Sequence, residues 1–488
     1  MSESQIVRAV RAAAARRPES VALASPREAL PYAGLERRAA AVAAQLAAVP
    51  EDVVGLLHPN SPGFAAGLLG ALWAGKTVAV LPWIAPAPLV KLMAAEAGLR
   101  TALAAEELAL RATEAGLIPL LAQPADAARF PAEPRPAPRR LEAAVLLYTS
   151  GTTGRPKAVA LSEANLLANA EGCRIAGEFT ADDVMLAILP LFHAFGLTVT
   201  LLLPLVLGGK VVLEDRFVPR TTLQAVATHR VSAMIGVPSQ FRLLAKEPAA
   251  VDAASLRLCI AGAERLGDHV GEAFQSRFAR SLLQGYGATE AAPVVSFNRP
   301  ATNRPGTVGQ PLPNLRVTIR DGETVLPAAE YGEVCIEGPN VMLGYYGQPA
   351  ATAEKIRNGV LHTGDRGWLD AEGYLHLSGR ADDMLKIAGE KVYPAEVERV
   401  LEHLPGVEEA AVVGITEGDR GTALAAFVVP RAGAALDAAK LRTACGSELG
   451  PAKLPRTFTL VDQIPRGLSG KVDKKALVDA ALTQTPKA

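Results

Sequence analysis

The sequence lacks net charge and is poor in cysteine. Its 50 Lys and Arg residues balance 50 Asp and Glu residues among 488, which gives no electrostatic footprint for nucleic acid or an acidic membrane surface. Its four cysteines are far apart, without a CxxC pair or the Cys/His spacing of a zinc site. These absences argue against a disulfide framework and predict a reducing, cytoplasmic setting.

No apolar run is long enough to predict a membrane span. The run at residues 197–207 stops at Gly208-Gly209-Lys210, and the stretch at residues 64–90 is interrupted by Lys76 and three prolines. Both are predicted to be buried core. The N-terminal segment "MSESQIVRAVRAAAARRPES" has its apolar residues separated by arginines, which argues against a secretory signal. We expect an amphipathic first helix there, with a transit peptide as the alternative.

Short apolar strands alternate with amphipathic helices along most of the chain, which predicts an α/β fold with a largely parallel sheet. In one such unit, "LRLCIAGAERL" is a strand ending in a loop, and "GDHVGEAFQSRFA" is a helix with Val270, Phe274 and Phe278 on one face. The next segment, "RSLLQGYGATE", is a second strand ending in a glycine loop. Both loops are expected at the same sheet edge, where open α/β sheets bind ligands.

The composition changes near residue 380, where charged residues become dense around a short turn. Pro394 suits the first turn of a helix whose apolar face is formed by Val397, Val400, Leu401 and Leu404. Strand-like "EEAAVVGI" and "LAAFVVP", a further helix and "TFTLV" follow. We predict a large N-terminal domain (residues 1–381) of mixed, largely parallel sheets flanked by helices, and a small mobile α+β domain (residues 382–488).

The segment "LLYTSGTTGRPKAVALS" at residues 146–162 combines two glycines with hydroxyl and basic residues. It is not a Walker A loop, in which a lysine directly follows the second glycine and a helix begins there, because Arg155 follows Gly154. Strands are predicted on both sides, and Ser162 is predicted to cap the next helix. The glycine N–H groups, the hydroxyls and Lys157 nevertheless suit an anion. The alternative interpretation is a polar hairpin turn.

The string "YTSGTTGRPKAV" resembles the signature loop of the adenylate-forming superfamily, which includes acyl-CoA synthetases, peptide-synthetase adenylation domains and beetle luciferases. Further landmarks of that family occur along the chain in the family's order, two before this loop and five after it: "LPYAGLERRAAAVAAQL", "LLGALWAGKTVAVLP", "LPLFHAFG", "QGYGATEAAP", "LHTGDRGWLD", "GRADDMLKIAGEKVYPAEVE" and "PRGLSGKVDKKAL". The resemblance therefore covers most of the chain. It implies an enzyme that uses ATP to convert a carboxylate to an acyl-adenylate, releases pyrophosphate, and lets a thiol displace AMP.

The resemblance also implies roles for individual residues. The phosphates would be held by Thr149, Ser150, Gly151, Thr152, Thr153, Gly154 and Lys157. The adenine would lie between Tyr286, flanked by Gly285 and Gly287, and the segment Gly262, Ala263 and Glu264. Thr289 would bond the α-phosphate, Glu290 would hold Mg²⁺, and Asp365 with Arg380 would bind the ribose.

Asp382 matches the family's hinge, about which the small domain rotates between two half-reactions. One pose would bring Lys471 over the reacting carboxylate and the α-phosphate. The other would bring residues 386–390, with Gly389, beside the thiol tunnel. His193 matches the family's histidine near the carboxylate, and the alternative is an ordinary structural histidine.

The substrate is expected to be a fatty acid, with an aryl or short-chain acid as the alternative. An amino acid is disfavoured because Phe192-His193 stands where amino-acid-activating relatives carry an aspartate. The middle of the chain resembles acyl-carrier-protein synthetases and long-chain acyl-CoA synthetases. The resemblance implies an acyl pocket lined near Val237-Pro238-Ser239, Gly262 and Ala263, where small residues leave room for an extended chain. Coenzyme A is favoured over an acyl carrier protein as the acceptor. A luciferase-type oxidase and a non-catalytic acyl-adenylate binder are the rival functions.

Overall fold

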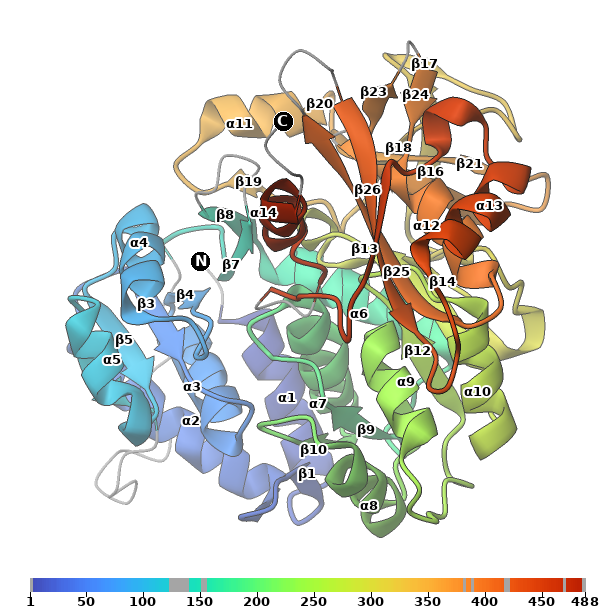
Figure 1. The fold of residues 1–488 in the computed structure, drawn as a ribbon. Coiled ribbons are helices and arrows are strands. Elements are labelled where there is room, and N and C mark those ends of the chain that lie inside the picture. Colours follow the sequence, from blue (N-terminus) through green and yellow to red (C-terminus); the bar gives the residue numbers. More distant parts are fainter. Residues whose placement is uncertain are drawn as a thin grey trace. The chain divides into compact units, whose positions relative to one another are not determined.

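The computed structural model describes residues 3–122, 140–150, 156–380, 383–387, 390–416, 422–467 and 471–484 (Figure 1). The chain divides into two compact units, one formed by Met1–Val317 with Cys335–His362 and the other by Thr318–Val334 with Thr363–Ala488. Strands and helices alternate along the first unit, which confirms the α/β class. The predicted division after residue 381 remains a prediction, because residues 381 and 382 lie outside the described ranges.

The first unit contains a nine-stranded sheet in which six neighbouring strands are parallel and the strands at both ends are antiparallel. In spatial order the strands are β15 (Gln310–Pro311), β14 (Val294–Phe297), β13 (Leu282–Gly287), β12 (Leu258–Ala261), β11 (Ala233–Gly236), β9 (Val184–Ala187), β10 (Lys210–Leu213), β1 (Val21–Ala24) and β2 (Ala29–Pro31). The predicted unit around β12 and β13 is confirmed, since these two strands are parallel and joined through α10 (Asp268–Phe278).

A second sheet of the same unit has seven strands, five of them parallel. In spatial order they are β19 (Gly344–Tyr345), β8 (Pro156–Leu161), β7 (Val145–Ser150), β4 (Thr77–Val80), β3 (Val53–Leu57), β5 (Thr101–Ala104) and β6 (Ile118–Leu121). β8 runs antiparallel between β7 and β19. The pairing of β19 with β8 places Gly344 and Tyr345 beside the strand that follows the predicted phosphate loop.

Helices of the first unit pack on both sheets. They are α1 (Gln5–Arg16), α2 (Tyr32–Leu46), α3 (Pro62–Trp73), α4 (Ala87–Ala97), α5 (Ala109–Glu114), α6 (Glu163–Gly177), the π-helix η3 (Gly196–Leu202), α7 (Leu203–Leu207), α8 (Pro219–His229), α9 (Pro238–Lys246), α10, and α11 (Pro349–Lys355). One apolar cluster contains buried side chains from α1, α2 and α3 together with strands of both sheets. Burial of each large apolar side chain contributes about 1.5–3 kcal/mol, so the two sheets are stabilised by a shared core.

The apolar segments are buried over most of their length, as the sequence predicted, but within residues 64–90 Ile84 is 37% exposed, which corrects the prediction there. α1 is amphipathic, with Ile6 and Val10 buried and Ser4 capping its first turn. Every residue of α3 is buried, as is every residue of η3. Within the described ranges, no helix combines the length and the apolarity needed to cross a membrane. The four cysteines are free, and each is buried.

The second unit includes β21 (Val360–Leu369) from Thr363 onwards and the whole of β22 (Leu375–Arg380), and in this antiparallel pair Asp365 lies opposite Arg380. The other strands of that sheet are β16 (Arg316–Asp321), β17 (Thr324–Val325), β18 (Gly332–Glu337) and β20 (Ile356–Arg357), the last of which belongs to the first unit. Towards the C-terminus lie β23 (Leu385–Ile387), β24 (Glu390–Val392), α12 (Pro394–His403), β25 (Val407–Thr416), β26 (Thr422–Pro430), α13 (Ala438–Glu448), β27 (Thr457–Leu460) and α14 (Lys474–Gln484).

The C-terminal elements agree with the α+β pattern predicted for this region. Pro394 begins α12, and Val397 and Leu401 are buried on its inner face. β25 pairs antiparallel with β26, which pairs parallel with β27. Their apolar cluster also includes the buried Cys445 of α13.

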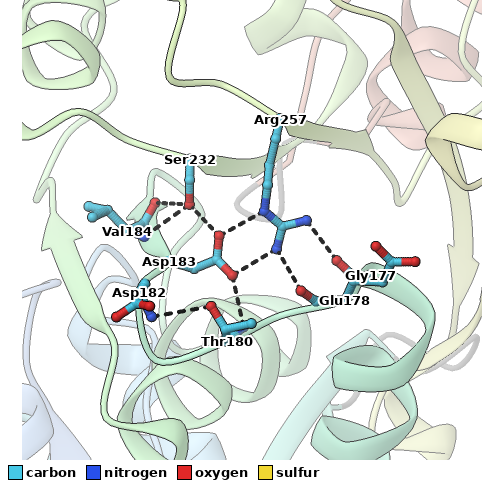
Figure 2. Close-up of polar contacts among 8 residues, drawn as sticks. All are labelled: Gly177, Glu178, Thr180, Asp182, Asp183, Val184, Ser232 and Arg257. Atoms are coloured by element: carbon cyan, nitrogen blue, oxygen red, sulfur yellow. Dashed lines mark hydrogen bonds and ion pairs between the residues drawn. The ribbon is translucent and has the colours of Figure 1, made fainter.

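A polar network ties together the amino ends of three parallel strands in the nine-stranded sheet (Figure 2). Asp183, just before β9, accepts hydrogen bonds from Arg257 Nε and Nη2 at 2.8 and 2.7 Å and from Ser232 Oγ at 2.6 Å. The Thr180 backbone N–H donates to the same carboxylate at 2.8 Å. Arg257 also donates to the carbonyl of Gly177, the last residue of α6. The network satisfies a carboxylate that is only 8% exposed.

Candidate active site

The carboxyl ends of the parallel strands in the nine-stranded sheet gather most of the predicted site residues in the first unit. β9 leads into the loop containing His193, β11 into Val237, β12 into Gly262, and β13 into Glu290. Because neighbouring parallel strands end at one edge of a sheet, these segments come together although they are spread over about 100 residues of sequence. The predicted location of a ligand site at this edge is consistent with the fold.

The predicted phosphate loop lies in a strand-to-strand connection of the other sheet. β7 and β8 are antiparallel, with Thr149 opposite Lys157. α6 begins only after β8, where Ser162 Oγ accepts a hydrogen bond from the Asn165 N–H and forms a capping box. The strand-loop-strand context and the Ser162 cap were both predicted correctly. Residues 151–155 and the side chain of Ser150 lie outside the described part of the chain.

Lys157 and Glu290 are brought to the same tyrosine by the fold. The Tyr345 hydroxyl donates a hydrogen bond to Glu290 Oε1 at 2.9 Å. The Lys157 ammonium lies 5.1 Å from the centroid of the Tyr345 ring. Lys157 and Glu290, which were predicted from separate motifs, therefore contact the same tyrosine. Sequence reasoning did not identify Tyr345, because its role depends on β19 pairing with β8 far away in sequence.

The segment around Glu290 is held by a buried asparagine of α6. The side-chain amide of Asn169 donates to the carbonyls of Ala291 and Val294 at 3.2 and 2.8 Å and accepts from the Val294 N–H at 3.3 Å. In addition, the Glu290 carbonyl accepts from the Met342 N–H at 2.9 Å. Asn169 is fully buried, so these bonds are shielded from water. These hydrogen bonds were also not predicted, because α6 carries other polar residues, such as Asn165 and Glu171, and the sequence does not distinguish Asn169 from them.

A second buried asparagine fixes the loop that leads to His193. Asn60, which follows β3 and is 5% exposed, donates to the Leu189 carbonyl at 2.8 Å and accepts from the Leu191 N–H at 2.9 Å. His193 is half-buried, and its backbone N–H bonds the Pro190 carbonyl at 3.1 Å. The π-helix η3 begins three residues later, and such helices are frequent at functional sites. Asn60 thus links one sheet to the ligand edge of the other.

Gly262 allows a close approach by an aromatic ring. A Cβ at this position would lie 2.8 Å from Cε1 of Phe195, which no ordinary side chain could accept without movement. Ala263, next in the chain, has the left-handed φ of 71° and is exposed. Phe195 therefore lies directly against the segment predicted to line both the adenine and acyl sites.

Tyr286 lies in β13, opposite Ser296 of β14, and a bulge follows between Tyr286 and Gly287. It is half-buried, and Gly287 is exposed. Thr289 and Glu290 follow two residues after the strand and begin a short 3-10 turn. The adenine-binding assignment of Gly285, Tyr286 and Gly287 stays a prediction.

The predicted ribose pair is adjacent in the second unit. Arg380 Nη1 lies 3.6 Å from Asp365 Oδ1, with side chains 49% and 14% exposed. Lys471 is exposed, and its carbonyl accepts a hydrogen bond from the Gly467 N–H at 2.8 Å. Asp382 and Gly389 lie outside the described residues.

The donors around Glu290 fit Mg²⁺. This ion usually takes one or two carboxylates and completes its shell with phosphate oxygens and water. Glu290 is half-buried, its carboxylate is fixed by Tyr345, and Thr289 adjoins it with a hydroxyl oxygen. Oxygen ligands of this kind suit a hard cation, whereas the buried thiols do not.

Comparison with known proteins gives consistent matches along the chain. The family model described as "AMP-binding enzyme" matches residues 10–346, and the one described as "AMP-binding enzyme C-terminal domain" matches residues 396–471. A feruloyl-CoA synthase from Amycolatopsis sp. is 35% identical over 94% of this chain and 95% of its own length. A long-chain-fatty-acid–CoA ligase from Bacillus subtilis is 35% identical over 69% of this chain and 61% of its own length. The crystal structure of ATP-bound MatB from Rhodopseudomonas palustris superimposes with a TM-score of 0.90 at 28% identity, covering 98% of this chain and 99% of MatB.

Proposed function

Since the chain belongs to the AMP-binding enzyme family and is an acid–thiol ligase, we propose that it joins an apolar carboxylic acid to coenzyme A through an acyl-adenylate. The observation that supports this most directly is the convergence of Lys157 and Glu290 on Tyr345, next to the loop that resembles a phosphate-binding signature. A basic and an acidic side chain on one rigid ring suit a magnesium–triphosphate group.

The proposed first half-reaction forms a bond between a carboxylate oxygen and the α-phosphorus of ATP, and the bond to pyrophosphate breaks. Lys157 would neutralise part of the phosphate charge, the hydroxyls around Thr149 would donate hydrogen bonds to phosphate oxygens, and Thr289 would hold the α-phosphate. Mg²⁺ held by Glu290 would supply further positive charge to the phosphate oxygens. Asp365 and Arg380 would fix the ribose, so that the two reactants are held in line.

In the proposed second half-reaction the thiol of coenzyme A attacks the acyl carbon, and AMP leaves. We propose that the small domain rotates about Asp382 between the two steps, with Lys471 serving the first step and residues 386–390 the second. An acyl carrier protein would present the same phosphopantetheine thiol and remains the competing acceptor.

The identity of the acid has two candidates. A fatty acid is favoured by apolar side chains close to the ligand edge, since Leu189, Val199 and Val237 belong to one buried cluster. An arylpropenoic acid, like that named for the Amycolatopsis relative, is favoured by the Phe195 ring lying against Gly262. A flat ring stacks on an aromatic side chain more favourably than a flexible chain does.

A pyrophosphate-release screen tests the proposal. Acids from acetate to palmitate, benzoate and ferulate are each supplied with ATP and Mg²⁺, first with coenzyme A and then with holo carrier protein. We expect release with apolar acids and thioester formation with coenzyme A. A preference for amino acids would contradict the substrate class. Oxygen uptake without thiol-dependent turnover would favour the oxidase, and no release with any acid would favour the non-catalytic binder.

A further inference from the structure

Tyr345 contacts the two charged residues that the proposed function assigns to the magnesium–triphosphate group. Its hydroxyl donates to Glu290 Oε1, and its ring lies under the Lys157 ammonium. The tyrosine itself is 6% exposed. Glu290 and Lys157 are half-buried, so water competes less for both contacts than it would on an open surface.

The backbone of Tyr345 is fixed on several sides. It pairs with Val159 of β8, and its N–H donates to Thr352 Oγ1 of α11 at 2.9 Å. Its carbonyl accepts from the Gln348 N–H at 3.0 Å. Because its backbone is fixed, the ring and hydroxyl of Tyr345 have little freedom to move. They can therefore restrict the positions of Glu290 and Lys157, which contact them.

The two contacts act on different properties of the site. The hydroxyl selects one position of the Glu290 carboxylate, because a hydrogen bond to a charged oxygen is directional. The ring face attracts the Lys157 ammonium without satisfying its N–H donors, so those donors stay able to reach a phosphate. One side chain thereby sets the spacing between an acidic and a basic partner of the same ligand.

We propose that Tyr345 is a positioning residue that aligns Glu290 and Lys157 before the metal–nucleotide complex binds. The inference rests on the proposed function, and it assigns to Tyr345 a role in nucleotide binding rather than in recognition of the acid. A site arranged in advance loses less free energy on binding than one that must be ordered by its ligand.

The test compares Tyr345→Phe with the matched control Tyr346→Phe. Both remove one phenolic hydroxyl from adjacent positions, but the described contacts connect only Tyr345 to Glu290 and Lys157. Binding of Mn²⁺ with a non-hydrolysable ATP analogue is measured by electron paramagnetic resonance and by calorimetry. We expect Tyr345→Phe to raise the Kd about tenfold, the scale of one hydrogen bond to a charged group, and Tyr346→Phe to leave it unchanged.

A double-mutant cycle separates positioning from a general loss of structure. In a Glu290→Gln background, Tyr345→Phe should change the Kd much less than it does in the wild type, because the carboxylate that it orients is gone. The KM for ATP should rise while the KM for the acid stays constant. Additive effects in the cycle, equal changes in both KM values, or wild-type binding by Tyr345→Phe would each overturn the inference.

The outcomes distinguish this inference from the proposed function. If the wild type binds the metal–nucleotide but releases no pyrophosphate with any acid, the proposed function fails and the comparison of Kd values still decides the role of Tyr345. If turnover is normal and Tyr345→Phe binds as the wild type does, only the role of Tyr345 fails. Thermal unfolding of each variant without ligand shows whether a change in Kd follows a change in stability.

Discussion

Asp183 lies in a network whose charge is sensitive to acid (Figure 2). Burial alone would raise its pKa, but the hydrogen bonds from Arg257, Ser232 and the Thr180 N–H outweigh burial and hold the pKa below its ordinary value of 3.8. A lowered folded-state pKa means that the ionised carboxylate stabilises the fold. This stabilisation is present above the unfolded-state pKa and is lost as the pH falls through the folded-state value.

Substitution of Asp183 should therefore destabilise the protein most at neutral pH. We expect Asp183→Asn to lower the free energy of unfolding by about 2–4 kcal/mol at pH 7, because Arg257 loses its charged partner. The difference from the wild type should shrink below about pH 4, as the wild-type carboxyl group takes up a proton. Denaturant unfolding of both proteins across this pH range measures the difference in unfolding free energy. Asp182→Asn is the control, since Asp182 is 84% exposed, and an equal loss there would contradict the prediction.

Glu214 responds to pH in the opposite direction. Burial raises its pKa from 4.5 to about 7, with the charge of Asp215 adding to the rise, although Thr222 Oγ1 donates to its Oε2 at 2.6 Å. Between these two values the folded state holds a proton that the unfolded state has lost. The contribution of Glu214 to stability is therefore full below about pH 4.5 and declines as the pH rises towards 7.

Replacement of Glu214 by glutamine should remove this decline. The amide oxygen can still accept from Thr222, and no proton is lost as the pH rises. We expect Glu214→Gln to match the wild type near pH 4.5 and to be more stable at pH 8, by up to about 3 kcal/mol for a pKa shift of this size. Unfolding free energies of both proteins, measured at pH 4.5 and pH 8, check this expected difference in stability. A difference that does not change with pH would show that Glu214 ionises normally in the fold.

At the scale of elements, the sequence predicted the strands and helices that have a local signal. The strands on both sides of the phosphate loop, the Ser162 cap and the β12–α10–β13 unit all follow from short-range patterns. The hydrogen bonds made by Asn60 and Asn169 do not follow from such patterns, because their partners are more than 120 residues away in the sequence. Only the pairing of strands places such side chains beside each other, and a single sequence does not encode that pairing locally.

The loop after β9 offers an element-scale test of substrate choice. Phe195 lies against Gly262, so removal of its ring should open space at the ligand edge. We expect Phe195→Ala to shift the kcat/KM ratio between ferulate and palmitate towards palmitate by about tenfold or more, since a lost ring contact and added space both act in that direction.

The change in the kcat/KM ratio must be specific to substitution of Phe195 in the loop after β9. Phe278→Ala on α10 removes another half-buried ring and serves as the control, with lower stability but an unchanged substrate ratio. A Phe195→Ala enzyme whose ratio stays constant would show that the ring does not touch the acyl group.

At the scale of the whole molecule, the proposed rotation of the small domain assigns different residues to the two half-reactions. Lys471→Ala should lower acyl-adenylate formation by on the order of 10²–10³, the scale of one preorganised charge partner. Thioester formation from supplied acyl-adenylate should largely persist. Single-turnover measurements of the two half-reactions separate these rates.

The control for this prediction is Lys475→Ala, which removes an exposed lysine of α14 and should affect neither half-reaction. Equal loss of both half-reactions in Lys471→Ala would exclude the rotation as proposed. The motif around Lys471 gave this role by resemblance alone, because an exposed lysine near a chain end has no pattern that distinguishes it from a solubilising one.

The burial of the four cysteines bears on how such an enzyme avoids modifying itself. An acyl-adenylate reacts with thiolates, and the protein must keep this electrophile for the thiol of its acceptor. Burial raises the pKa of Cys173, that of Cys259 to about 12 and that of Cys445, with help from Glu448, to about 11. Cys335 is equally enclosed, with no exposed surface. Burial thus keeps the thiols of Cys173, Cys259 and Cys445 protonated and places all four cysteines out of reach, which disfavours self-acylation in competition with product formation.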